Sequence, residues 1–209
     1  MIFYSVCGDV MPFPRNWVEE LIFEWLSLKG YSTLANVPLK SGKPGGREEA
    51  DVIGFKLKEQ DVWEIVHVEC GSLGKNFKDN LERVKRKFSP DRVRVVKNIS
   101  ANIIGAENVV GRLTLGKTRL TKFEYKPIFV TSYIAEKQVS EMREELKKLG
   151  IEFMTLEDLL EKVLKDMDEW VKRRRKLGLT KSAGRPMLPE SWWLLKLIEY
   201  MKHKKIIRA

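Results

Sequence analysis

Cysteine and histidine are scarce in this chain, which has two of each among its 209 residues. Small domains that depend on disulfides carry many more cysteines, and structural zinc sites need several clustered Cys or His ligands. Cys7 and Cys70 lie far apart in the sequence, and neither belongs to such a cluster. The sequence therefore argues against a disulfide scaffold and against a structural zinc site, and it fits a reduced intracellular protein.

Long hydrophobic runs are also missing, because no apolar stretch approaches the roughly 18 residues that a transmembrane helix needs. The N-terminal segment lacks the basic region of a signal peptide and is too short for one. We therefore expect a cytoplasmic protein with no membrane-spanning segment. Glutamine occurs only at positions 60 and 138, and charged residues make up 33% of the chain. That composition suggests an archaeal or thermophilic protein, although an ordinary charged surface explains it equally well.

The excess positive charge is concentrated at the C-terminal end. The chain has a net charge of +10, and residues 171–209 carry 12 basic and 2 acidic residues, which accounts for the whole excess. Such a cluster favours contact with a polyanion, most simply DNA, with RNA as an alternative. A solvated helix end and an ordinary connecting loop are the competing explanations. The residues that we expect to contact phosphates are Lys40, Lys43 and Arg47 in a Gly-rich loop, and Arg173, Arg174, Arg175, Lys176, Lys181 and Arg185 near the C-terminus.

Hydrophobic periodicity and capping residues predict an α/β fold with a mixed central sheet flanked by helices. Residues 89–125 contain β-like patches at 93–96 and 109–115, and we treat this stretch as a possible insertion. We expect a main domain over residues 1–170 and a basic helical extension over residues 171–209. The predicted helices span 16–29, 76–88, 136–149, 156–176 and 190–203, and the predicted strands span 31–39, 50–57, 62–70, 127–132 and 151–154.

Two acidic residues occupy matching positions on neighbouring predicted strands. Asp51 and Glu69 each lie at one end of an apolar, β-branched run, and a hairpin that turns at residues 58–61 would place them side by side. Adjacent carboxylates repel each other and cost stability unless a cation lies between them. The pair therefore predicts a site for a hard divalent cation, Mg²⁺ or Mn²⁺.

The order of these acidic segments resembles the PD-(D/E)xK nuclease superfamily, and within it archaeal Holliday-junction resolvases and Mrr-like restriction endonucleases. The likeness is carried by residues 18–22 (VEELI), 46–53 (GREEADVI) and 65–69 (IVHVE), and it covers residues 16–88. Residues 127–132 and 151–160 resemble the second half of the same core. The resemblance implies a restriction-endonuclease-like core and a metal-dependent endonuclease that hydrolyses phosphodiester bonds in branched or duplex DNA.

The resemblance also implies roles for individual residues. Asp51 and Glu69 would hold Mg²⁺ or Mn²⁺, and the carbonyl of Cys70 would complete the metal's coordination shell. Glu19 would be the acid that a helix contributes to the site. A homodimer is expected because cutting two strands suits two-fold symmetry, with the Trp-rich final helix as part of its interface.

One position departs from the family pattern, which places a lysine two residues after the glutamate. This chain has Gly71 there. Another lysine could take over the role of orienting the attacking water; Lys75 and Lys78 are the nearest candidates, ahead of Lys56. Alternatively, the chain is a catalytically inactive nucleic-acid-binding protein on a decayed nuclease fold.

Two of the candidate residues also have simpler explanations. Glu19 lies three residues after Asn16 and could complete a capping box at the start of the first helix. His67 shares a strand face with Glu69, and a hydrogen-bonded, half-buried histidine is the interpretation we prefer for it. We expect Cys70, on the opposite face, to pack in the core.

Overall fold

The computed structural model describes residues 16–39, 48–59, 62–115, 122–178 and 188–207. The strands form one mixed sheet in the order β1-β2-β3-β4-β5, antiparallel from β1 to β3 and parallel from β3 to β5. The elements in chain order are α1 (Trp17–Leu28), β1 (Ser32–Pro38), β2 (Glu49–Glu59), β3 (Val62–Ser72), α2 (Phe77–Lys87), α3 (Pro90–Leu115), β4 (Lys122–Tyr133), α4 (Glu136–Lys148), β5 (Glu152–Thr155), α5 (Leu156–Lys176) and α6 (Trp193–His203).

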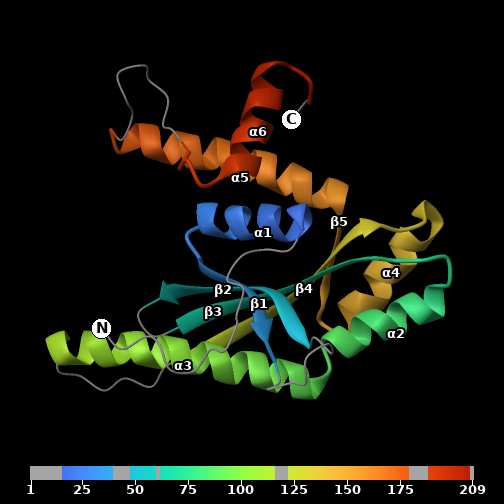
Figure 1. The fold of residues 1–209 in the computed structure, drawn as a ribbon, viewed down its shortest axis with the longest axis horizontal. Helices are drawn as coiled ribbons and strands as arrows, with labels where there is room; N and C mark the ends of the chain where they lie inside the picture. Colours follow the sequence, from blue (N-terminus) through green and yellow to red (C-terminus); the bar gives the residue numbers. More distant parts are fainter. Residues whose placement is uncertain (1–15, 40–47, 60–61, 116–121, 179–187, 208–209) are drawn as a thin grey trace.

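Helices cover both faces of the sheet (Figure 1). On one face, buried side chains of α1, α5 and α6 pack with residues of β2 to β5 in one hydrophobic cluster. On the other face, α3 packs on β1 to β3, while α2 and α4 pack near β4 and β5. The strands therefore bury side chains on both sides, as the predicted α/β layering requires, and the mixed sheet flanked by helices is confirmed.

The helix α1 forms where the sequence predicts it. The side chain of Asn16 accepts hydrogen bonds from the backbone N–H groups of Val18 and Glu19, which otherwise have no partner at a helix start. The apolar residues of α1 recur at helical spacing and face the sheet, as the buried Leu21 shows. Gly30 ends the helix with a φ of 83°, a left-handed conformation that glycine adopts without strain.

The β-like patches expected at residues 93–96 and 109–115 are wrong, because α3 runs without a break from Pro90 to Leu115. Val96, Ser100 and Ile104 are buried at intervals of four residues, so they share one helix face against the sheet. Burial on this helical stripe outweighs the β propensity of the Val and Ile residues. Since α3 contributes to the hydrophobic core, the stretch is an integral layer of the fold rather than a peripheral insertion.

The C-terminal segment is also part of the main core. Thr155 and Asp158 form a capping box at the start of α5, and the boundary expected between residues 170 and 171 falls inside this helix. The final helix begins at Trp193, later than predicted, and its residues Leu194, Leu195 and Ile198 join the cluster that contains α1. The predicted basic helical extension thus includes a helix, α6, that packs on α1 in the same hydrophobic cluster.

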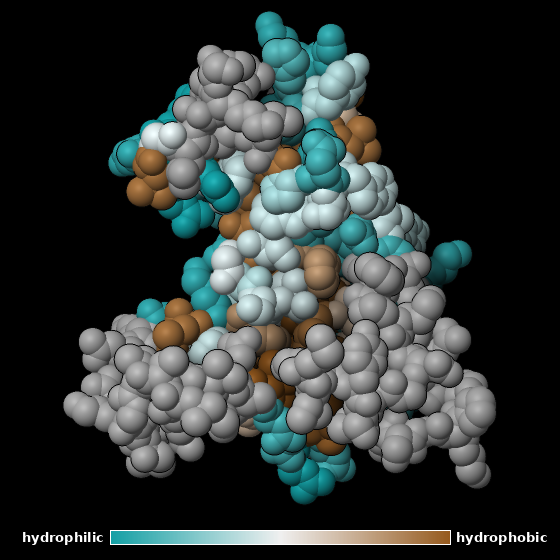
Figure 2. All heavy atoms as spheres, turned by 60° about the vertical axis from the view of Figure 1, so that its left-hand side comes forward, coloured by the Kyte–Doolittle hydropathy of each residue, from teal (hydrophilic) through white to brown (hydrophobic). Residues whose placement is uncertain are grey.

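Hydrophilic side chains dominate the described surface on the side shown in Figure 2, and hydrophobic side chains show in smaller patches between them. None of the helices in the described ranges is long and apolar enough to cross a membrane.

Candidate active site

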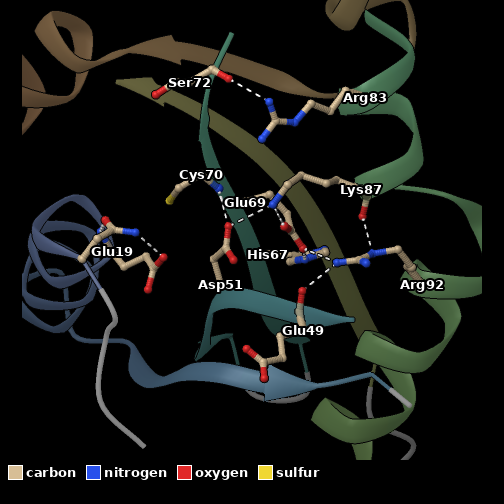
Figure 3. Close-up of polar contacts among 11 residues, drawn as sticks. Glu19, Glu49, Asp51, His67, Glu69, Cys70, Ser72, Arg83, Lys87 and Arg92 are labelled. Atoms are coloured by element: carbon tan, nitrogen blue, oxygen red, sulfur yellow. Dashed lines mark hydrogen bonds and ion pairs between the residues drawn. The ribbon is translucent and has the colours of Figure 1, made fainter. Parts of the chain in front are cut away.

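The predicted carboxylate pair is confirmed. β2 and β3 pair in an antiparallel register that sets Val52 opposite Val68, and this register places Asp51 opposite Glu69. The ammonium of Lys87, at the end of α2, lies between the two carboxylates (Figure 3). Its Nζ atom is 3.1 Å from Asp51 Oδ2 and 2.5 Å from Glu69 Oε2. A cation therefore occupies the position where the sequence predicts that one is needed.

Glu69 is completely buried, with 0% of its side chain exposed, and several donors surround it. Besides Lys87, His67 Nε2 lies 2.9 Å and Arg92 Nη2 lies 3.0 Å from Glu69 Oε1. Burial alone would raise the pKa of Glu69, but the hydrogen bond to His67 and the charge of Lys87 outweigh it and lower the pKa. Glu69 is therefore held as a carboxylate in a fixed orientation.

A second hydrogen bond, to Tyr125, holds the His67 ring that orients Glu69. The Nδ1 atom of His67 lies 2.6 Å from the hydroxyl of Tyr125, on β4, and the ring is completely buried. With a neutral ring, Nε2–H donates to Glu69 while Nδ1 accepts from Tyr125, so both contacts are satisfied by one tautomer. The preferred interpretation of His67 as a hydrogen-bonded histidine is confirmed, and its burial exceeds the expectation.

Asp51 differs from its partner, since 19% of its side chain is exposed. Its Oδ2 accepts a 2.6 Å hydrogen bond from the backbone N–H of Cys70. Burial and the charge of Glu69 raise the pKa of Asp51 to about 6, although Lys87 and the Cys70 N–H oppose the shift. The site thus combines one firmly ionised carboxylate with one that holds a proton more readily.

Cys70 contacts the site through its backbone N–H, and its expected carbonyl contribution to a metal shell stays a prediction. The side chain is half-buried against the cluster that contains α1, α5 and α6, as expected of a core residue. Burial raises the pKa of the thiol well above its ordinary value, and the nearby charge of Asp51 raises it further. Cys70 is therefore an unreactive thiol at neutral pH.

Glu19 lies in the first turn of α1 and is buried. The Asn16 side chain accepts from the Glu19 N–H at 3.0 Å and also donates to the Glu19 carboxylate. In Figure 3 that carboxylate points from α1 toward the side of the sheet that carries Asp51. Glu19 therefore supports the start of α1, and the same orientation is compatible with its expected role at the site.

The lysine that reaches the carboxylates is not one of the expected candidates. Lys75 and Lys78 are exposed at the start of α2, and Lys56 Nζ donates to the backbone carbonyl of Lys29 at 2.8 Å. Lys87 was missed because it follows Glu69 by 18 residues and comes from the far end of a helix. Its position three residues after Val84 was a usable signal, since it places Lys87 on the buried face of α2.

Arg92 is a second site residue that the sequence did not reveal. Its Nη2 donates to the backbone carbonyl of Glu49 at 2.7 Å, and its Nε donates to the carbonyl of Lys87 at 3.0 Å. The same guanidinium contacts Glu69, so Arg92 ties the first turn of α3 to β2, to β3 and to the end of α2. These contacts fix the backbone from which Lys87 extends.

Among the expected phosphate-binding residues, Lys40, Lys43, Arg47, Lys181 and Arg185 lie outside the described residues. The basic run Arg173, Arg174, Arg175 and Lys176 forms the last turn of α5.

That basic helix end lies at some distance from the carboxylate pair. Arg173 lines a hollow together with Lys29, which follows the C-terminal end of α1, whereas Glu19 lies in the first turn of the same helix. At 1.5 Å per residue, this separation along α1 is about 15 Å.

The donor set suits a small divalent cation that is bound by few protein ligands. In the part of the chain that the structure describes, no three His, Cys, Asp or Glu residues cluster in a metal-binding arrangement. Mg²⁺ is commonly held by one or two carboxylates, with water and substrate phosphates completing its octahedral shell. Asp51 and Glu69 can supply these carboxylates once Lys87 moves from between them.

The search for related proteins found no matching family model, curated protein or solved structure.

Proposed function

We propose that this protein is a metal-dependent DNA endonuclease that hydrolyses phosphodiester bonds. The observation that carries the proposal is the contact of Lys87 with both Asp51 and Glu69. It supplies, from α2, the lysine that the nuclease pattern places at Gly71. The order of a helix, three antiparallel strands and a second helix around the carboxylates (α1, β1, β2, β3 and α2) and the parallel β3, β4 and β5 agree with the restriction-endonuclease-like core that the resemblance implies.

The chain's own residues support this chemistry in distinct ways. His67 and Arg92 hold the Glu69 carboxylate in place, so that it keeps its orientation when Lys87 moves. The Lys87 ammonium can move from the carboxylates to the phosphate undergoing attack, where it would offset the developing negative charge. A bound Mg²⁺ or Mn²⁺ would supply an activated water and further stabilisation of charge.

The test is a cleavage assay on labelled duplex, single-stranded, flap and four-way-junction DNA with Mg²⁺, Mn²⁺ or EDTA. Wild type should cut only with metal, and Glu69→Gln should abolish cutting because it removes the charge while keeping the shape. Glu64→Gln is the matched control, since Glu64 is a buried acid of the same strand that pairs with Tyr31 and Lys126 instead. Cutting in EDTA, or full activity of Glu69→Gln, would overturn the proposal.

A second candidate function is binding of DNA without cleavage, on a decayed nuclease fold. Lys87 favours it in one respect, because its ammonium and the Arg92 guanidinium already offset the two carboxylate charges and reduce the need for a metal. This candidate predicts equal DNA affinity with Mg²⁺ or EDTA and no cutting with either. It also predicts that calorimetric titration with Mg²⁺ or Mn²⁺ gives no heat that depends on Glu69.

A further inference from the structure

A basic hollow of about 660 Å³ lies where α2 meets α3, next to the carboxylate pair. Leu39 and Glu48, at the facing ends of the β1–β2 connection, form its opposite wall. We call this hollow the α2–α3 groove. Five of its lining residues are cationic: Arg83, Arg86, Lys87, Arg92 and Arg94.

Positive charge prevails among the described residues that line the α2–α3 groove, because the acids among them are Glu48 and Asp91. Asp91 pairs with Arg94 at 3.1 Å, but their side chains are 87% and 73% exposed, so this ion pair is weak and easily exchanged for another partner. Ser89 also lines the groove, just before the first turn of α3, where the helix dipole favours anions. The groove is therefore suited to anionic groups.

The groove continues directly into the candidate active site. Lys87 belongs to both, since it lines the groove and contacts Asp51 and Glu69. Arg92 likewise lines the groove and contacts Glu69. Arg83 and Arg86 are exposed on α2, and Arg83 reaches β3, where it donates to the Ser72 carbonyl at 3.1 Å. A chain of phosphates that reaches Lys87 would meet these arginines next.

The composition of the groove indicates how it would recognise a ligand. Arginine can bind the guanine edge as well as phosphate, but base stacking needs aromatic side chains and bidentate recognition of adenine needs Asn or Gln. Neither kind is present among the residues found to line the groove, whose apolar members are Leu39 and Val95. Arginines are instead suited to phosphates, which they bind through two parallel hydrogen bonds.

We propose that the α2–α3 groove binds the sugar–phosphate backbone of DNA beside the bond presented to Asp51 and Glu69. The inference rests on the proposed function for its ligand, and it assigns the binding surface to α2 and α3. It departs from the expectation that DNA is held by the basic C-terminal residues 171–209 and by the loop with Lys40, Lys43 and Arg47.

The test measures binding of a fluorescent DNA duplex to the full chain by anisotropy, in EDTA and over a range of salt concentrations. The groove variant is Arg83→Gln/Arg86→Gln/Arg94→Gln, and the matched control is Arg173→Gln/Arg174→Gln/Arg175→Gln, which removes equal charge from α5. The groove variant should bind at least about tenfold more weakly, and its log–log salt slope should be shallower by about 2 to 3, because each phosphate contact contributes about 0.9. The control should stay within about threefold of wild type.

Two further measurements test whether the loss of affinity reflects phosphate binding rather than impaired folding or recognition of base sequence. The double variant Arg86→Gln/Arg94→Gln leaves the Ser72 contact intact, and it should show an intermediate loss of affinity with an unchanged unfolding midpoint. Two duplexes of unrelated sequence should lose affinity equally. Wild-type affinity of the groove variant, or a larger loss in the α5 control, would overturn the inference even if the wild-type protein cuts DNA. Groove-dependent binding without cutting under Mg²⁺ or Mn²⁺ would uphold it and overturn the proposed nuclease activity.

Discussion

The Lys87 ammonium is shared by two carboxylates from neighbouring strands, and this arrangement makes a direct prediction for catalysis. Lys87→Ala should lower kcat for DNA cleavage by about 10²–10⁴-fold, the usual contribution of a group that assists proton transfer or stabilises developing charge. Lys75→Ala and Lys78→Ala are the controls, because both lysines are exposed at the other end of α2. Single-turnover cleavage rates would measure the effect. Wild-type rates for Lys87→Ala would remove it from the mechanism.

The position of Gly71 permits a test by relocation of the lysine. A Cβ atom at Gly71 would lie 3.7 Å from Phe129 and 3.8 Å from Arg83, which are ordinary van der Waals distances. Residue 71 also shares a strand face with Glu69. Gly71→Lys/Lys87→Ala should therefore recover part of the cleavage rate that Lys87→Ala loses. Gly71→Ala/Lys87→Ala is the control, and recovery there, or none with lysine, would contradict a shared role for the two positions.

The raised pKa of Asp51 predicts a pH-dependent stability without metal. Burial and Glu69 raise this pKa from 3.8 to about 6, so the folded protein holds the proton more tightly than the unfolded chain does. Asp51 therefore lowers the free energy of unfolding above pH 6, by on the order of 2–3 kcal/mol, and this cost disappears as the pH falls toward 4.

Asp51→Asn removes that titration. Between pH 7 and pH 4, the free energy of unfolding of wild type should therefore rise relative to that of the variant, as measured by urea denaturation in EDTA. Asp168→Asn, which changes an exposed acid of α5, should leave a nearly constant difference from wild type. If the Asp51→Asn difference is also constant, the raised pKa is contradicted.

The sequence predicted that Asp51 and Glu69 lie side by side, because strand alternation and a short hairpin determine their pairing locally. It did not predict Lys87 or Arg92, since their contacts depend on how α2 and α3 pack on the sheet. No local pattern encodes that packing. The amphipathic spacing of α2 shows which of its faces is buried, but not which strand residues that face meets.

At the scale of elements, the start of α6 is held by a side chain from a distant helix. Glu24 of α1 is buried, and its carboxylate accepts from the backbone N–H of Leu194 at 3.2 Å and from that of Leu195 at 2.8 Å. These N–H groups have no partner within α6, because they lie in its first turn. Glu24 thus takes the place of a local capping residue and joins the two helices.

Glu24→Ala should lower the free energy of unfolding by about 2–4 kcal/mol, because it leaves buried donors unsatisfied and opens a cavity. Glu24→Gln, which keeps one acceptor oxygen, should cost less. Glu161→Ala, at an exposed position of α5, should change the value by no more than about 0.5 kcal/mol. Chemical denaturation monitored by circular dichroism would give all three values. An equal, small effect for Glu24→Ala and Glu161→Ala would show that the cap is unimportant.

Elements with clear local signals were predicted well, and those decided by distant packing were not. The helices predicted over 16–29, 136–149 and 156–176 agree closely with α1, α4 and α5, whose ends carry a cap at Asn16, a glycine at residue 150 and a cap at Thr155. In contrast, the β-branched residues of α3 suggested strands, although the helical stripe through Val96 and Ile104 decides the structure. The start of α6 was placed too early because its cap, Glu24, lies on another helix.

At the scale of the whole molecule, α6 belongs to the same hydrophobic cluster as α1 and α5, so the chain should unfold as one unit. A chain ending at residue 187 would lose Leu194, Leu195 and Ile198 from that cluster, which is a loss on the order of 5 kcal/mol. The truncated chain should therefore unfold at a much lower urea concentration or fail to fold. Coincident transitions by circular dichroism and tryptophan fluorescence would support one unit, whereas an unchanged midpoint after truncation would contradict it.

Lys87 belongs both to the α2–α3 groove and to the carboxylate pair, and this has a consequence for how DNA and metal would influence each other's binding. Its ammonium must leave the carboxylates before a divalent cation can take that position, and a phosphate in the α2–α3 groove offers it another partner. Under the proposed function, metal and DNA would then bind cooperatively, since each one favours the Lys87 position that the other requires. Thermodynamic reciprocity makes the two enhancements equal: Mg²⁺ raises the affinity for DNA by the same factor by which DNA raises the affinity for Mg²⁺.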